Sequence, residues 1–353
     1  MRKTTWVLIV IAFVSVAAVK FSPGPKPYPF PKLGYFPPMP VAEDNIPTVE
    51  GVALGRFLFY DPILSADSTF SCGSCHHQSK AFSDAPNRFS EGLNGELMSR
   101  NTLPLFNLAW YPGLFWDGSA STSEDQVFHP VAAHAEMNLE WALAEERVAR
   151  SSFYQPKFAA AFGEVPIDST HIAKAIAQFE RTLISYNSKY DKVLRGEARF
   201  TKAEYNGFVI VNDQSMGDCM HCHVTDGHAL GTNARYANNG LDMALTPADY
   251  LDPGRMTVTG NPDDAGRFKT PTLRNIALTA PYMHDGRFKT LEEVIDFYSS
   301  GVHAGINTDS KMTRAHEGGV HLTENEKSDV LSFLYTLTDS VFIANPEFGN
   351  PFH

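Results

Sequence analysis

The chain has 353 residues, of which 43% are hydrophobic and 20% charged, a balance that suffices to bury two modest cores. Its formal net charge is −11 at pH 7, and its Lys and Arg residues do not cluster. This excludes nucleic-acid binding, because phosphate recognition needs a basic face. A basic or neutral protein partner fits the charge better.

The N-terminus has the pattern of an export signal. The cationic residues Arg2 and Lys3 precede an apolar run from Trp6 to Val19, which is short for a membrane span. We predict that residues 1–20 are a signal peptide or a retained N-terminal anchor, so the protein is exported to the periplasm. If the segment is retained, it tethers the protein to the membrane.

Residues 21–47 are rich in proline. Such a composition favours an extended, polyproline-like linker over a packed element. We therefore expect the folded part of the chain to begin near Thr48.

In the first half, helical spacing of apolar residues predicts a helix over Val49 to Phe59, which Asp61-Pro62 ends. Residues 84–101 are rich in Gly, Ser and Asn without periodicity, which indicates a loop. Further helices are predicted over Leu139 to Arg150 and over His171 to Ser185.

The second half has the same general order. A capping box, Thr201 with Glu204, begins one helix, and Thr323 with Glu326 begins the last. We place the boundary between the halves near residue 197, which divides the folded chain into domains 48–197 and 198–345.

All four cysteines lie in two copies of the pattern Cys-x-x-Cys-His. Two thiols three residues apart on one helical turn can reach the two vinyl groups of a haem, while the histidine points at the iron. We therefore predict two covalently attached c-type haems. Their attachment residues are Cys72, Cys75, His76, Cys219, Cys222 and His223.

Cys-x-x-Cys also serves dithiol redox sites and zinc knuckles. A dithiol site of the thioredoxin type lies in a βαβ pattern, which neither neighbourhood shows. A zinc site does not need a histidine directly after the second cysteine in both copies. Both alternatives are weaker than the haem interpretation.

Four further stretches carry a family resemblance. They are Phe115-Trp116-Asp117-Gly118, Ala135-Glu136-Met137-Asn138, Phe179-Glu180-Arg181-Thr182-Leu183, and Thr270-Pro271-Thr272-Leu273-Arg274-Asn275 continuing to His284-Asp285-Gly286. Over residues 48–340 the chain resembles the bacterial dihaem cytochrome c peroxidases and their MauG-like relatives. The resemblance implies a mainly α fold with two cytochrome c-like helical domains. It also implies that hydrogen peroxide reacts at the N-terminal haem and that the C-terminal haem transfers electrons.

The resemblance implies that His76 and His223 are iron ligands. Residues 80–105 contain no histidine where peroxidases of the family often supply a displaceable ligand, so the first haem is expected to be open. In the second half, Tyr298 lies fourteen residues after His284, at a position where peroxidases have methionine. Tyrosine is a harder donor that favours ferric and higher states, and this difference is MauG-like.

Two alternatives to Tyr298 stay open, namely ligation of the second iron by Met283 or by Met256. In that case Tyr298 is simply an aromatic residue on a helix predicted over Leu291 to Ser299.

For the first haem, the family pattern implies a distal pocket built from Gln126, Pro130 and Glu136. Glu136 would be the acid-base residue that moves a proton during peroxide cleavage, and Gln126 would orient the oxidant. We expect the nearby His129 and His134 to be structural.

Trp116 matches the tryptophan that lies between the two haems in the family, where an oxidisable indole can pass electrons. His284 matches a supporting position near a haem propionate. The resemblance also implies one calcium ion, since oxygen-only ligation suits calcium. Its ligands would be Asn101, Thr279 and Pro281.

The sequence thus predicts a peroxidase that takes electrons from a small cytochrome c or cupredoxin. A second hypothesis is a MauG-like enzyme that uses peroxide to oxidise Trp or Tyr of a partner protein. A third is a dihaem electron carrier without catalysis, which the pairing of Gln126 with Glu136 argues against, because a carrier has no use for an open coordination position.

Overall fold

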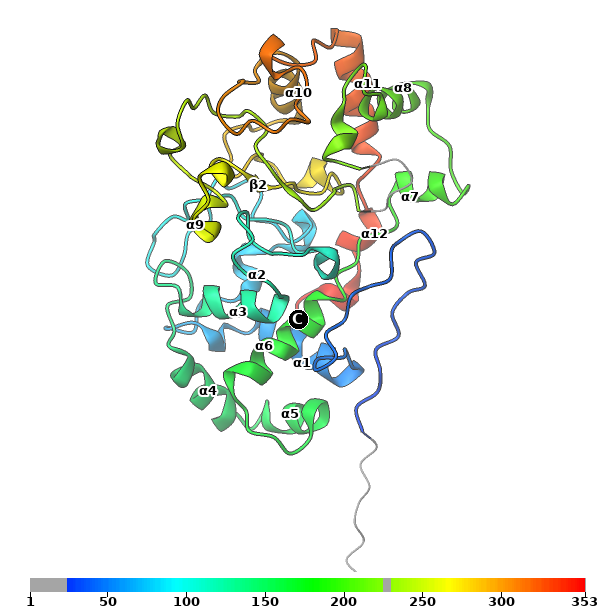
Figure 1. The fold of residues 1–353 in the computed structure, drawn as a ribbon. Helices are drawn as coiled ribbons and strands as arrows, with labels where there is room; N and C mark the ends of the chain where they lie inside the picture. The colour runs from blue at the N-terminus through cyan, green and yellow to red at the C-terminus, as the bar shows by residue number, and fades with distance from the viewer. Residues whose placement is uncertain (1–23, 225–229, 353) are drawn as a thin grey trace, which may run out of the picture.

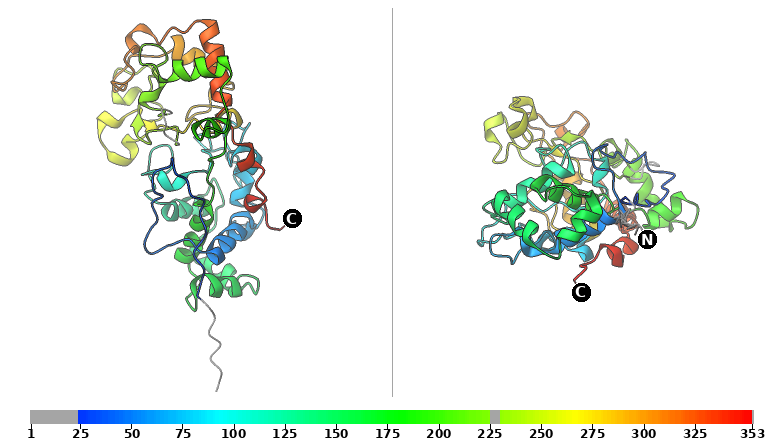
Figure 2. Two further views of the ribbon diagram at one scale, coloured as in Figure 1. Left: turned by 90° about the vertical axis from the view of Figure 1, so that its right-hand side faces the viewer. Right: turned by 90° about the horizontal axis from the view of Figure 1, so that it is seen from below.

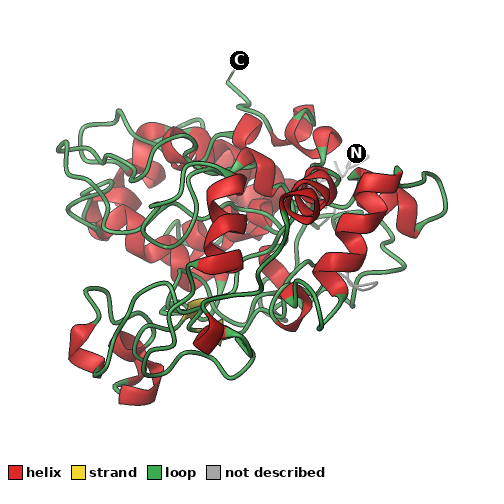
Figure 3. Ribbon diagram, turned by 90° about the horizontal axis from the view of Figure 1, so that it is seen from above, coloured by secondary structure: helices red, strands yellow, loops and turns green. Residues whose placement is uncertain are grey.

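The computed structural model describes residues 24–224 and 230–352, and within them the chain is mainly helical (Figures 1 and 3). The segment predicted to be a signal or anchor, residues 1–20, lies outside the described residues. Within the described ranges, no helix is long and apolar enough to cross a membrane.

Six helices form the first half of the chain. They are α1 (Val49–Tyr60), α2 (Cys72–Cys75), α3 (Ser123–Ala132), α4 (Trp141–Arg150), α5 (Gln155–Phe162) and α6 (Ser169–Glu180). The predicted helix after Thr48 is confirmed, and the Thr48 hydroxyl caps it by accepting from the Gly51 amide at 3.0 Å. Helix α6 ends five residues earlier than predicted, where the chain turns and the Thr182 hydroxyl donates to the Phe179 carbonyl at 2.7 Å.

Among the described residues, the second half contains six α-helices and one small antiparallel sheet. They are α7 (Lys189–Leu194), α8 (Lys202–Asn212), β1 (Tyr236–Ala237), α9 (Met256–Thr259), β2 (Phe268–Lys269), α10 (Leu291–Ser300), α11 (Glu324–Tyr335) and α12 (Ser340–Ile343). Both predicted capping boxes are present, at Thr201 with Glu204 and at Thr323 with Glu326.

Each half has its own hydrophobic core, and the two lobes are visible in Figure 2. In the first lobe α1 packs on α6, and Leu58, Phe59 and Phe179 are buried there. In the second lobe α8 packs on α11, around the fully buried Phe333.

The two cores divide the chain differently from the predicted boundary at residue 197. Tyr190 of α7 packs in the second core, whereas Phe342 and Phe348, near the C-terminus, pack in the first. Figure 1 shows α12 beside the helices of the N-terminal half. The chain therefore leaves the first lobe before α7 and returns to it after α11, an exchange that local sequence patterns do not reveal.

The proline-rich segment is extended but it is not a free linker, so this part of the prediction is wrong. Its backbone pairs with the start of the first lobe, where the Val49 amide donates to the Lys26 carbonyl at 2.8 Å. The ring of Phe36 is 7% exposed and packs against Ile184 and Trp110. The aromatic residues between the prolines give the segment an apolar surface that is buried against the body.

A buried ion pair ties α7 to the motif that begins at Thr270. The side chain of Arg274 donates to the Asp191 carboxylate at 2.8 Å, and both side chains are at most 1% exposed. Burial by itself would raise the pKa of Asp191, but the hydrogen bonds and charge of Arg274 outweigh it, and the pKa is lowered.

Replacing Asp191 by Asn should lower the free energy of unfolding by about 3–5 kcal/mol, because Arg274 then stays buried without its counter-charge. Guanidinium denaturation followed by circular dichroism measures this. The exposed pair of Lys327 with Glu324 is the control, and Glu324→Gln should leave the midpoint unchanged. Equal midpoints for Asp191→Asn and wild type would show that the pair adds nothing.

Candidate active site

Each Cys-x-x-Cys-His motif opens onto its own cavity. The first cavity, about 800 Å³, is lined by Cys72, Cys75 and His76. The second, about 250 Å³, is lined by Cys219, Cys222 and His223. The cysteines of the first motif lie on α2, while the second motif begins with a 3₁₀ helix, η4 (Cys219–His221).

Both motif histidines are held in the same way by a backbone carbonyl. The Nδ1 atom of His76 lies 2.7 Å from the Phe82 carbonyl oxygen, and that of His223 lies 3.0 Å from the Pro271 carbonyl oxygen. A carbonyl can only accept, so Nδ1 carries the proton in each ring and Nε2 keeps its lone pair for a metal. Burial lowers the pKa of both histidines to about 4, which keeps them neutral.

The residues around the first cavity fit a haem. The attachment cysteines and the histidine line the same wall, and the lining is mostly apolar, as a porphyrin requires. The carboxylate of Glu180 also lines this cavity, is 3% exposed, and has one oxygen, Oε2, without a hydrogen-bond partner among the described residues. Burial raises the pKa of Glu180 to about 8, so it is protonated near neutral pH.

The structure brings the predicted distal residues together. Gln126 and Pro130 line the first cavity from α3, and Glu136 lines it from the turn that follows. Burial raises the pKa of Glu136, which suits a group that exchanges a proton near neutral pH. The backbone fixes this turn, since the Leu93 amide donates to the Glu136 carbonyl at 2.9 Å.

The loop predicted over residues 84–101 has no helix or strand, and several of its residues line the first cavity. No histidine comes from it, as the sequence shows. His129 of α3 lines the cavity too, and its ring packs edge-on against Phe115 at 5.3 Å. His134 is instead exposed, 3.4 Å from the Glu96 carboxylate.

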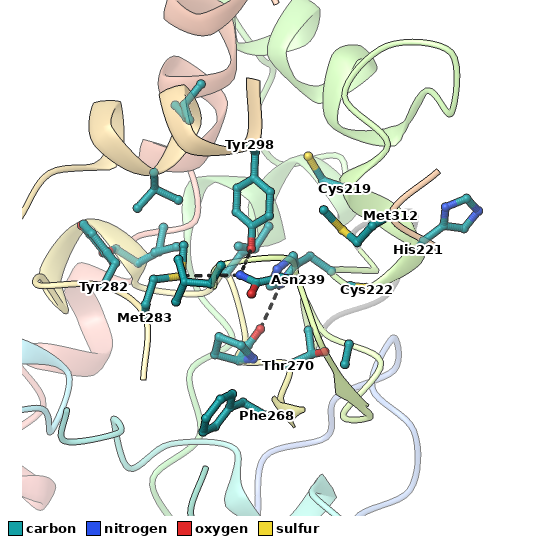
Figure 4. A pocket seen from close by; sticks show the side chains of 18 of the residues that line it. Cys219, His221, Cys222, Asn239, Phe268, Thr270, Tyr282, Met283, Tyr298 and Met312 are labelled. Atoms are coloured by element: carbon teal, nitrogen blue, oxygen red, sulfur yellow. Dashed lines mark hydrogen bonds between the residues drawn. The ribbon is translucent and has the colours of Figure 1, made fainter. Parts of the chain in front are cut away.

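The side chain of Tyr298 projects from α10 into the second cavity, and its hydroxyl faces Asn239 (Figure 4). The amide nitrogen of Asn239 donates to the Tyr298 hydroxyl at 3.0 Å and contacts the Met283 sulfur at 3.7 Å. Met283 therefore lies in the same pocket as Tyr298, whereas Met256 is in α9 and does not line it. Burial raises the pKa of Tyr298 to about 12.

Both cavities are closed by one shared wall. The residues that line both are Asn101, Leu103, Pro104, Trp116, Lys269, Pro271 and Thr272. Trp116 is 8% exposed, and its indole nitrogen donates to the Asn101 carbonyl at 2.7 Å. The predicted inter-haem position of Trp116 therefore coincides with the wall between the two cavities.

Asn101, Thr279 and Pro281, the three residues expected to bind calcium, all line the second cavity. The side-chain amide of Asn101 donates to the Arg88 carbonyl at 3.0 Å. His284 lines this cavity as well, is 7% exposed, and stacks on Phe268 with ring centroids 3.7 Å apart.

Several groups of the site have no signal in the sequence. The carbonyls of Phe82 and Pro271 act through the backbone, so side-chain patterns do not reveal them. Asn239 lies outside any motif and meets Tyr298 only through the fold. Glu180 lies inside a quoted motif, but its burial at the first cavity depends on tertiary packing.

The fold and the two pockets define the class of dihaem c-type cytochromes, and comparisons with known proteins identify the family. A model of the family described as di-haem cytochrome c peroxidase matches residues 49–199. The chain is 33% identical to the methylamine utilization protein MauG of Methylorubrum extorquens over 302 residues, which cover 85% of this chain and 81% of that protein.

It is also 34% identical to the cytochrome c551 peroxidase of Nitrosomonas europaea over 301 residues, 84% of this chain and 81% of the relative. A crystal structure of a MauG-like protein associated with microbial copper homeostasis superposes with a TM-score of 0.83. That protein is 37% identical to the chain, and the match covers 92% of this chain and all of the other. The chain belongs to the di-haem cytochrome c peroxidase family, a family of peroxide-dependent oxidoreductases.

The turn that carries Glu136 is packed closely against Gly92. A Cβ atom at this position would lie 1.7 Å from the Ala135 carbonyl oxygen and 3.0 Å from the Glu136 Cα atom. Glycine is therefore needed here for the close approach of two backbone segments.

Replacing Gly92 by Ala should lower the free energy of unfolding by about 1–3 kcal/mol, the usual cost of overpacking. The matched control is Gly34→Ala, since nothing lies within 4 Å of a Cβ atom there. Thermal unfolding of both variants measures the difference. If the two variants unfold at the same temperature, the backbone around Gly92 can shift at no cost, and its packing does not hold Glu136 in place.

Proposed function

We propose that this protein reduces hydrogen peroxide in the first cavity with electrons that pass through the second. The observation that supports the proposal best is the meeting of Glu136 and Gln126 in the cavity that also contains Cys72, Cys75 and His76. An acid-base residue of raised pKa beside an amide is what cleavage of an O–O bond requires.

The cofactors in this proposal are two c-type haems, attached through thioethers at Cys72 and Cys75 and at Cys219 and Cys222. His76 and His223 would hold the irons, through the Nε2 atoms that the carbonyls leave free. A bound haem supplies a redox-active iron to which peroxide can bind. In this assignment the first lobe is the peroxidatic domain and the second the electron-transfer domain.

The reaction consumes two electrons and two protons, since H₂O₂ + 2e⁻ + 2H⁺ gives two molecules of water. Glu136 would take the proton from one peroxide oxygen and deliver it to the other, which leaves as water. Gln126 would donate a hydrogen bond that keeps the peroxide oriented. The mostly apolar lining of the cavity lowers the local dielectric and would strengthen both contacts.

Trp116 would pass electrons between the sites, a role supported by its burial in the wall that both cavities share. The electrons would come from a small cytochrome c or cupredoxin, whose basic or neutral surface suits the net charge of −11. His284, stacked on Phe268, would support a haem propionate.

We further propose that one calcium ion is held at Asn101, Thr279 and Pro281. Their common position at the second cavity supports this. Among the described residues there is no cluster of three or more His, Cys, Asp or Glu that could hold a metal, so the ligands would be amide and carbonyl oxygens. The N-terminal pattern of residues 1–20 supports export to the periplasm, with cleavage or retention as a tether.

A second candidate function is MauG-like oxidation of Trp or Tyr in a partner protein. The observation that favours it is the position of Tyr298, whose hydroxyl lies within the second cavity beside Asn239. The two candidates share the first cavity and differ in what supplies the electrons. Met283 lies in the same pocket and is the competing ligand.

Replacing Glu136 by Gln should lower the second-order rate constant for peroxide by about 10²–10⁴-fold, because the variant cannot exchange the proton. Stopped-flow spectroscopy measures this constant. Glu91→Gln is the matched control, since Glu91 lines the same cavity but is exposed. A rate constant equal to wild type in Glu136→Gln would assign the proton transfer to another group.

Replacing Tyr298 by Phe tests the ligand of the second iron. In the electron paramagnetic resonance spectrum of the ferric protein, we expect one high-spin and one low-spin haem, and the low-spin signal should be lost in Tyr298→Phe. The control Tyr282→Phe, a tyrosine of the same pocket whose hydroxyl donates to the Ile276 carbonyl, should keep it.

If the protein has the MauG-like function, one equivalent of peroxide should convert the wild type to a long-lived state in which both the high-spin and the low-spin signal are lost. Retention of the low-spin signal in Tyr298→Phe would instead point to Met283. Two low-spin signals that respond to peroxide only after half-reduction would indicate a reductively activated peroxidase.

A further inference from the structure

Lys269 is a buried cation in the shared wall. It ends β2, where its backbone pairs with Tyr236 of β1, and the residue is 5% exposed. Lysine is rarely buried to this degree without a carboxylate partner, because removing an ammonium group from water is costly.

The contacts of its ammonium group are weak ones. Nζ lies 3.4 Å from the Gly113 carbonyl oxygen and 4.6 Å from the centre of the Tyr111 ring. Among the described residues, no carboxylate oxygen lies within 4.0 Å of it. Asp117 influences its charge, but the carboxylate of Asp117 is already paired with Arg100 at 2.6 Å.

The electrostatics agree with this geometry. Burial lowers the pKa of Lys269 to about 7, and the charge of Asp117 only partly opposes that effect. An additional anion beside Nζ would restore the pKa and keep the ammonium charged. The described residues do not supply that anion, whereas a cofactor bound in one of the two cavities can.

The position of Nζ favours the first cavity. Lys269 lines both cavities, but Tyr111, over which the ammonium lies, lines only the first. Each haem carries two propionate carboxylates, and these are the anions that a haem brings to a pocket.

We infer that Lys269 is a positioning residue that binds a propionate carboxylate of the haem in the first cavity. The inference rests on the proposed function in one respect, that a haem is bound at Cys72, Cys75 and His76. It adds a residue to which the family resemblance assigns no role. It also implies that this lysine raises the reduction potential of the first haem, because a fixed positive charge disfavours the more positive, oxidised state.

The test is a spectroelectrochemical titration of both haems in the purified holoprotein at pH 7. Replacing Lys269 by Met keeps the length and removes the charge, so the midpoint potential of the first haem should fall by about 59 mV, a tenfold change in the equilibrium constant. The potential of the second haem should change less. Lys269→Arg keeps the charge and should restore the wild-type value.

The control is Lys289→Met, which removes the charge of an exposed lysine two residues before α10. It should leave both potentials unchanged. The inference is overturned if Lys269→Met leaves the first potential at the wild-type value, or if both potentials shift equally, as a general structural change would cause.

A measurement on the wild type covers the case in which Lys269→Met does not fold. An ammonium–propionate hydrogen bond shifts the propionate bending band in the resonance Raman spectrum when H₂O is exchanged for D₂O. A band of the first haem that does not move would refute the contact.

Failure of the proposed function is recognised separately. A pyridine haemochrome assay that finds no haem on the wild-type chain would overturn both, because the propionate would be absent. A count of two with no peroxide turnover would remove the peroxidase function alone, and the potentials would still decide the role of Lys269.

Discussion

The hydrogen bond from the Lys269 amide to the Trp116 carbonyl, 2.7 Å long, joins the two halves of the molecule at the wall between the cavities. Two residues further along the chain, the Pro271 carbonyl orients His223. The segment from Lys269 to Pro271 therefore lines both cavities, bonds to the backbone of Trp116 and orients the ring of His223. One backbone segment therefore contributes contacts to both cavities.

The lobes are held together by groups that local sequence does not pair. The buried carboxylate of Asp339 accepts from the Ser185 hydroxyl and from the amides of Tyr186 and Asn187, at 2.8–3.1 Å. Asn275 adds a bond to Ser185 at 3.0 Å. The side chains of Asp339, Ser185 and Asn275 are at most 1% exposed, so breaking a hydrogen bond between them leaves an unpaired polar atom away from water. A buried polar network therefore joins these segments in addition to apolar packing.

The features of the fold that the sequence predicts correctly depend on residues close together in the chain. The helix after Thr48 and the capping boxes at Thr201 and Thr323 follow from residues three or four positions apart, and they are present. The cavity residues Glu136 and Tyr298 were found through family register, and the structure places each in the expected pocket. The burial of Phe36 was missed because it depends on Ile184 and Trp110, which are far away in the sequence. Backbone partners cannot be predicted at all from side-chain chemistry.

The low polarity of the first cavity shifts the pKa values of the ionisable groups that line it. Burial raises the pKa of both Glu136 and Glu180, and that of Glu180 rises to about 8, so Glu180 is accommodated there near neutral pH without a cation. The same burial acts in the opposite direction on Lys269, whose charge is then the costly one. A haem brings carboxylates that can pair with Lys269, whereas it brings no base for Glu136. In the proposed assignment, Glu136 would therefore stay free to exchange protons with peroxide, while Lys269 would pair with the haem.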